Sequence, residues 1–267
     1  MTVRRLILSF AAMLALLTPC RGQHATLPER MMEPFRQNYI LTGLPLNTAP
    51  DYNTNDLVFQ ISARFNVAVL PHDWEFFLGY TQLSVWDVYM PSNPFRANTY
   101  SPGVYFAHEG RKVLWLTGYE HRSNGYASYE SRSLDYGFVT VSAGLGRCFT
   151  AQATGRFGIG SIGNDFSLEM FTKYQGFVNV ALAAHTPDKR LMLDVSASPL
   201  FGGDIPANLS AQLSWCPLRQ TDWFRLTVRY HYGYDENQND CGVSDVFLKH
   251  MLRFGLSIQP RHLSVLD

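Results

Sequence analysis

Three residues whose types suit nucleophilic chemistry lie in one short stretch, GYEHRSNGYASYESRSLD, which spans residues 118–135. His121 and Ser123 are two positions apart, and Asp135 closes the stretch. A serine hydroxyl can attack an ester when a histidine accepts its proton and a carboxylate orients the imidazole. A polar hairpin can also contain these three residue types by chance, so their positions in the fold must decide between the two interpretations.

The residues before the pair predict how it is presented. Alternate positions of an extended segment share one face, and this face carries Val113, Trp115, Thr117, Tyr119, His121 and Ser123. Side chains two residues apart in a strand lie about 7 Å from each other. Asn124 and Gly125 suit a tight bend, and the next strand begins near Ser133. If the two strands pair as a hairpin, Asp135 lies beside His121.

Polar and apolar residues alternate with a period of two through much of the chain, for example over residues 59–69, 208–215, 224–232 and 252–259. Each run is about as long as a tilted strand that crosses a bilayer, and roughly ten to twelve such segments lie between residues 56 and 260. We therefore expect an all-β fold, a transmembrane antiparallel β-barrel of about 12 strands.

A soluble β-sandwich also alternates, but two features favour the barrel. Arginines stand in the middle of the polar faces, at Arg64, Arg225, Arg229 and Arg253, where a hydrated lumen would accept them. The composition is 14% aromatic and only 16% charged. In a barrel, the face with Val113 and Trp115 meets lipid, so His121 and Ser123 lie at the outer rim with Tyr119 in an aromatic band.

The chain divides into three parts. Residues 1–22 predict a secretory signal peptide, because Arg4 and Arg5 precede a short apolar run that ends near Pro19. A lipoprotein signal through Cys20 is the alternative, and Pro19 fits it poorly. Residues 23–55 are rich in Pro, Asn, Thr and Arg and predict an N-terminal arm outside the barrel. Residues 56–267 form the predicted β-barrel domain that carries the catalytic hairpin.

Net charge excludes one class of partner. The formal net charge is +0 at pH 7, so the chain lacks the basic field that nucleic-acid binding requires. The glycines at positions 158, 160 and 163 spell GxGxxG, but no βαβ context follows them, so they are barrel or turn glycines and do not indicate a dinucleotide site.

The block GYEHRSNG followed by SRS resembles the outer membrane phospholipase A family, whose motif has histidine, serine, asparagine and glycine at this spacing at the end of a barrel strand. Supporting matches are YTQ at 80–82, SNPFRANTY at 92–100, NYILTG at 38–43 and GYDEN at 233–237. The resemblance implies a twelve-stranded outer-membrane barrel that hydrolyses acyl esters of membrane phospholipids and lysophospholipids, depends on calcium (Ca²⁺) and is active as a homodimer.

The resemblance also assigns catalytic roles. Ser123 matches the family's nucleophile and His121 its general base, and the backbone N–H of Ser123 or Gly125 would contribute to an oxyanion hole. Asp135 stands where the best-known family form has an asparagine. A carboxylate is the usual third member in serine hydrolases, so we expect this difference to alter the pH optimum rather than to abolish activity.

The same resemblance places the calcium ligands on the hydroxyl of Ser131, the backbone carbonyl of Tyr126 and the backbone carbonyl of Ser92 of the partner subunit. Ser128 stands where some relatives carry an aspartate near the ion. Gln82 matches a polar residue at the family's lipid-facing dimer interface; taken alone, it could equally be a lumen residue.

Two other functions stay open at this point. One is a non-enzymatic outer-membrane channel or structural barrel that retains the hairpin. The other is a secreted, soluble β-sandwich hydrolase.

Overall fold

The computed structural model describes residues 28, 30–51, 54–127, 131, 133–159, 169–218, 223–234 and 248–260. The predicted signal peptide, residues 1–22, lies outside the described residues. Among the described residues, no helix is long and apolar enough to cross a membrane.

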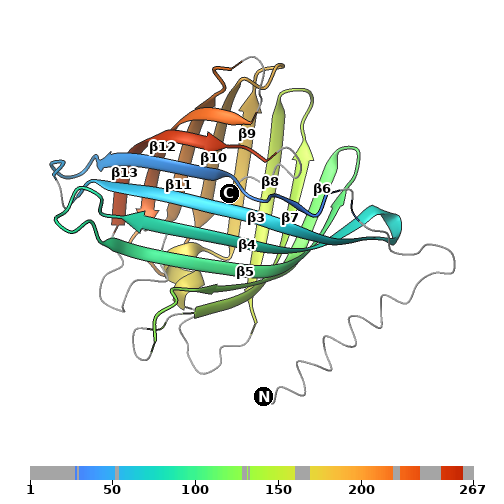
Figure 1. Ribbon diagram of the computed structural model, residues 1–267, viewed down its shortest axis with the longest axis horizontal. Helices are drawn as coiled ribbons and strands as arrows, with labels where there is room; N and C mark the ends of the chain where they lie inside the picture. Colours follow the sequence, from blue (N-terminus) through green and yellow to red (C-terminus); the bar gives the residue numbers. More distant parts are fainter. Residues whose placement is uncertain are drawn as a thin grey trace.

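Within the described residues, twelve antiparallel strands, β2 to β13, form a closed barrel (Figure 1). Each strand pairs with the next along the chain, and β13 pairs with β2 to close the sheet. This confirms the prediction from period-two alternation. The strands are β2 (Asn38–Pro45), β3 (Asp56–Leu70), β4 (Trp74–Trp86), β5 (Phe95–Glu109), β6 (Val113–Ser123), β7 (Ser133–Gly144), β8 (Phe149–Gly158), β9 (Val178–His185), β10 (Leu191–Pro199), β11 (Ala207–Trp215), β12 (Phe224–Tyr234) and β13 (Leu248–Ile258).

Three short elements accompany the barrel. Strand β1 (Met32–Pro34) pairs with the part of β3 that β2 leaves unpaired. A 3₁₀ turn, η1 (Pro71–Asp73), joins β3 to β4, and one helical segment, η3 (Met170–Gln175), precedes β9.

The barrel begins earlier in the chain than the sequence indicated. Residues 23–55 were expected to form an arm outside the barrel, whereas Asn38–Pro45 is a strand between β13 and β3. The physical reason lies in its inward face, where Tyr39 and Leu41 are buried in an apolar cluster with Val58. Because Ile40 and Leu44 on the outward face are apolar too, the strand lacks a clear polar and apolar alternation and is not recognised from its pattern.

Alternate residues along each strand point either into the lumen or toward the lipid. Arg64, Arg225, Arg229 and Arg253 all point inward, and none is more than 8% exposed. Outward positions on the same strands carry exposed apolar side chains such as Phe65, Leu226 and Phe254. The polar face therefore encloses the lumen and the apolar face is the membrane surface, as predicted.

Exposed aromatic residues mark the two membrane boundaries. The connections at one end of the barrel are short, as at residues 110–112 and 145–148, whereas those at the other end are long, as at residues 87–94, 124–132 and 159–177. Trp115, Phe149, Trp215 and Trp223 lie near the short connections, and Tyr89, Phe95 and Tyr126 lie at the opposite end. Such bands are typical of barrels whose long loops face outside the cell.

Side chains fill the lumen beside β3 to β7. Phe35 enters it between β1 and β2, and its ring packs edge-on against Phe77 and Tyr105 at centroid distances of 5.2 and 4.7 Å. Nearer the long connections, Arg253 binds Asp56 through two hydrogen bonds of 3.0 Å. The aromatic cluster around Phe35 packs against the inner side of β6 and β7 through Leu116, Leu134 and Tyr136.

Candidate active site

The pairing of β6 with β7 places His121 directly opposite Asp135. Nδ1 of His121 lies 2.8 Å from Oδ1 of Asp135, a hydrogen-bond distance. Their side chains are 39% and 23% exposed, on the outward face that also carries Trp115. The contact predicted from the hairpin is therefore present. With Asp135 ionised, Nδ1 carries the proton and Nε2 remains available to accept one.

Tyr119 extends this arrangement. Its hydroxyl donates a hydrogen bond to Oδ1 of Asp135, the same oxygen that faces His121. From the sequence, Tyr119 was expected only to lie in an aromatic band. The available signal was its spacing, because Tyr119 and His121 are two residues apart and therefore share a strand face. Two donors on one carboxylate oxygen restrict the orientation of Asp135.

Ser123 ends β6 and lies between two neighbours in the sheet, Tyr100 on β5 and Ser133 on β7. It is half-buried and on the same face as His121. In the part of the chain that the structure describes, no hydrogen bond joins the Ser123 hydroxyl to the His121 ring. Nucleophile and base are often further apart in a ligand-free site than in the complex with substrate.

The turn after Ser123 has a defined shape. The backbone N–H of Tyr126 donates to Oδ1 of buried Asn124 at 3.2 Å. Gly125 has a φ of 74°, in the left-handed region that favours glycine. The ring of Tyr100 packs so closely on Gly125 that a Cβ there would lie 2.8 Å from a ring carbon. Asn124 and Gly125 thus have a defined backbone conformation directly after β6, and the ring of Tyr100 packs against it.

A buried polar cluster supports the hairpin from inside the lumen. Glu120 is 0% exposed and lies between Tyr119 and His121 in the strand, so its side chain points the opposite way. Its carboxylate accepts hydrogen bonds from four side chains, namely Arg36 at 2.7 Å, Tyr105 at 3.0 Å, Arg122 at 3.3 Å and Tyr136. These donors connect the N-terminal segment, β5, β6 and β7 through one group. Such support restricts the backbone that carries the site.

The oxygen donors expected for calcium lie at the same end of the barrel. Tyr126 is 46% exposed and Ser131 is also exposed, both in the connection between β6 and β7. Ser92, with a φ of 66°, is in the connection between β4 and β5. Hydroxyl and carbonyl oxygens suit Ca²⁺, which takes six to eight oxygen ligands. Ser128 lies outside the described residues.

The donor set expected for calcium carries no carboxylate. Across the described residues, no group of three or more His, Cys, Asp or Glu side chains could hold a metal ion. The residues present therefore fit a calcium ion chemically, but its coordination would depend on neutral oxygens, water and a second subunit.

Gln82 lies on the outward, lipid-facing side of β4. It is therefore not a lumen residue. Its Oε1 accepts a hydrogen bond from exposed Tyr80 at 3.2 Å, and its Nε2 donates to Ser84 at 3.2 Å. The hydroxyl of Ser84 then donates to Asn98 on β5 at 2.7 Å. Gln82 also pairs with Tyr100, which pairs with Ser123. The polar row is therefore two strands from the serine, about 10 Å at the usual strand spacing.

Comparison with known proteins identifies the family. Residues 24–242 match the family model described as Phospholipase A1. The outer membrane phospholipase A from Escherichia coli is similar in structure, with a TM-score of 0.69, 20% sequence identity and coverage of 85% of this chain and 93% of that one. The Salmonella typhi outer membrane phospholipase dimer with bound calcium has a TM-score of 0.70 at 19% identity, covering 89% of this chain and 94% of that chain. A search of curated proteins finds no matching sequence.

Proposed function

The chain belongs to the phospholipase A1 family and is a β-barrel phospholipase of the outer membrane, and we propose that it hydrolyses acyl esters of phospholipids and lysophospholipids with a Ser123, His121 and Asp135 triad. One observation carries this proposal. The His121–Asp135 hydrogen bond lies on the membrane-facing surface, on the same strand face as Ser123. A site on the outer surface receives a substrate that diffuses in the plane of the bilayer.

Each residue of the triad has a defined task. The Ser123 Oγ attacks the ester carbonyl carbon while Nε2 of His121 takes its proton, and the same proton then passes to the oxygen of the departing alcohol. Water, deprotonated by His121, attacks the acyl-serine and releases the fatty acid. Asp135 orients the imidazole and stabilises its positive charge. The Tyr119 hydroxyl offsets part of the carboxylate's charge close to the lipid, where an ionised group is costly.

Calcium assistance is the second part of the proposal. Ser131, through its hydroxyl, and Tyr126, through its carbonyl, would hold the ion next to the turn that follows Ser123, with Ser92 of the partner subunit as a further ligand. A bound calcium ion would supply positive charge that stabilises the developing oxyanion. The backbone N–H groups of Ser123 and Gly125 would donate to the same oxyanion. The exposure of Tyr126 and Ser131 and their oxygen chemistry support this assignment.

Homodimerisation is the third part. Gln82 would contact its counterpart across the lipid-facing surface, where a side-chain amide can hydrogen-bond between two barrels. The row from Gln82 through Tyr100 to Ser123 supports this proposal, because a partner seated over Gln82 would also cover the region beside the nucleophile.

A lipid-hydrolysis assay tests the triad. Refolded protein should release fatty acid from mixed-micelle phospholipid, and Ser123→Ala should abolish release. Ser133→Ala is the matched control, since Ser133 lies directly opposite Ser123 on β7 and is exposed. A chelator should suppress release if calcium contributes. Equal hydrolysis by Ser123→Ala and the parent would contradict the triad, and conductance without any hydrolysis by folded protein would favour the channel hypothesis.

A further inference from the structure

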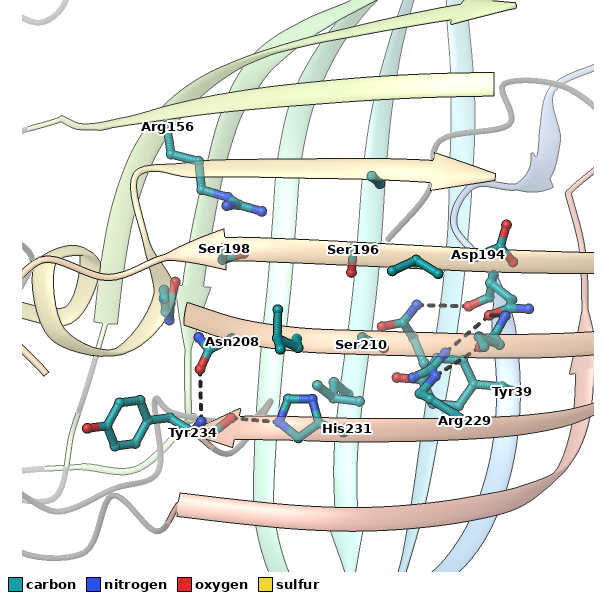
Figure 2. A pocket seen from close by; sticks show the side chains of 18 of the residues that line it. Tyr39, Arg156, Asp194, Ser196, Ser198, Asn208, Ser210, Arg229, His231 and Tyr234 are labelled. Carbon is teal, nitrogen blue, oxygen red and sulfur yellow. Dashed lines mark hydrogen bonds between the residues drawn. The ribbon is translucent and has the colours of Figure 1, made fainter. Parts of the chain in front are cut away.

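A polar cavity lies inside the barrel, on the far side of the wall from the triad. Its volume is about 260 Å³, and its lining comes largely from β8 to β12 (Figure 2). The lining includes the hydroxyls of Ser196, Ser198 and Ser210. A single water needs only about 10–15 Å³ measured in this way, so the cavity has room for a small ion together with water.

Positive charge is in excess at one end of this cavity. Arg122 and Arg156 both line it, and Arg36 and Glu120 lie within electrostatic reach of Arg156. The Glu120 carboxylate is already bound by Arg36 and Arg122. In the described part of the chain, this cluster therefore contains three guanidinium groups and one carboxylate.

Among the described residues of this cluster, Arg156 is the guanidinium that forms no direct ion pair, because Glu120 is bound by Arg36 and Arg122. Its side chain makes no hydrogen bond or ion pair within the described ranges, and Figure 2 shows it reaching into the cavity from β8. The Nε of neighbouring Arg122 is also buried without a hydrogen-bond partner there. The cavity's carboxylate, Asp194, lies on β10 beyond Ser196 and Ser198, away from Arg156 (Figure 2). Arg156 is half-buried, and a guanidinium that is partly removed from water without an ion-pair partner is unfavourable, so an anion at this place would stabilise the fold.

The other basic side chains that line the cavity, Arg229 and His231, already have hydrogen-bond partners. Arg229 donates to Gln212 at 2.9 Å and to Gln37 at 3.2 Å, and its guanidinium stacks on the Tyr39 ring. His231 uses Nε2 on the carbonyl of Tyr234 at 2.9 Å. Among the described lining residues, the charged donors without a hydrogen-bond partner therefore lie on Arg156 and Arg122.

We propose that this cavity binds a small free oxyanion of phosphate size between Arg122 and Arg156. A guanidinium presents its donors in a planar fork that matches two oxygens of a phosphate. The Ser198 hydroxyl, which accepts from Asn179 at 2.9 Å, keeps its own proton for a further bond. A lipid phosphate is a poor candidate, because its acyl chains would have to enter a polar lumen. The site is independent of the triad and does not depend on hydrolysis.

Calorimetric titration with inorganic phosphate tests the proposal. The full barrel is refolded in uncharged detergent with a chelator present, and chloride at matched ionic strength serves as the reference ion. We expect saturable binding of phosphate that weakens roughly tenfold to a hundredfold in Arg156→Gln, from the loss of a charged hydrogen-bond pair. Arg147→Gln is the matched control, because Arg147 is exposed in the short connection between β7 and β8 and should leave binding unchanged.

Two results would overturn the site. One is the absence of saturable phosphate binding by the parent protein, and the other is unchanged binding by folded Arg156→Gln. If Arg156→Gln does not fold, Arg156→Lys decides, since lysine keeps the charge but lacks the fork and should bind phosphate more weakly than the parent. Phosphate should also raise the urea midpoint of the parent barrel, whereas chloride should not.

Discussion

Replacing Glu120 with glutamine is expected to lower the free energy of unfolding of the barrel by about 3–5 kcal/mol. Glu120 is fully buried and accepts hydrogen bonds from two arginines and two tyrosines. Glutamine has nearly the same shape, so the substitution removes the negative charge while largely preserving volume. It also turns one acceptor oxygen into a donor that faces other donors.

The expected destabilisation by Glu120→Gln follows from the arginines that remain buried without a negative charge. Arg36 and Arg122, 2.7 and 3.3 Å from the carboxylate, would remain near Arg156 with no negative charge among them. Removing one member of a buried ion pair typically costs about 3–5 kcal/mol, because the remaining charge stays desolvated. The two tyrosine hydrogen bonds add to this cost, whereas water entering the cavity reduces it.

Glu75→Gln is the matched control. Glu75 binds Arg64 at 2.7 Å, but its side chain is 43% exposed, and Glu33 binds the same arginine at 2.7 Å. An exposed ion pair with a second partner contributes about 0–1 kcal/mol, so this variant should unfold almost like the parent. The two substitutions make the same chemical change on strands of one barrel.

Urea unfolding in detergent micelles, followed by tryptophan fluorescence, measures both variants against the parent. The midpoint of Glu120→Gln should fall, with a similar dependence on urea concentration, while Glu75→Gln should keep its midpoint. Equal destabilisation by the two variants would refute the reasoning, since burial and the number of partners would then not decide the cost. A Glu120→Gln effect below about 1 kcal/mol would refute it as well.

Three further predictions concern the outer surface. Tyr119→Phe should slow hydrolysis roughly tenfold to a hundredfold by removing a hydrogen bond to the carboxylate. In the Asp135→Asn variant, which lacks the negative charge, the additional Tyr119→Phe substitution should reduce the hydrolysis rate by a smaller factor. If steady-state kinetics show the same factor in the parent and in the Asp135→Asn variant, Tyr119 does not act by stabilising the carboxylate. Gly125→Ala should reduce the hydrolysis rate by about the same factor, since its positive φ and the Tyr100 ring force the turn to shift; unchanged kinetics would contradict this. Gln82→Leu should weaken the dimer by about 0.5–2 kcal/mol, and an unaltered monomer fraction in sedimentation with calcium would argue against its interface role.

The sequence alone was enough to predict the architecture and the location of the hairpin. Period-two alternation specifies which side chains share a face, so arginines at inward positions and Trp115 at an outward one already implied a membrane barrel. The same rule placed His121 and Ser123 together on the lipid-facing side. Gly125 was expected after the strand because glycine adopts a positive φ without strain, and it does have a positive φ.

Other features depended on tertiary structure, because they join residues that are distant in sequence or depend on strand register. The sequence placed Asp135 beside His121 only on the condition that the two strands pair. That contact and the Tyr119 hydrogen bond require one register of β6 against β7, and a shift of one residue would turn every side chain to the opposite face. The place of β2 in the barrel could not be recognised, because its apolar inward face packs into a cluster formed by other strands. The Arg36–Glu120 ion pair and the excess charge at Arg156 exist only once the barrel has closed, since closure brings these side chains into one lumen.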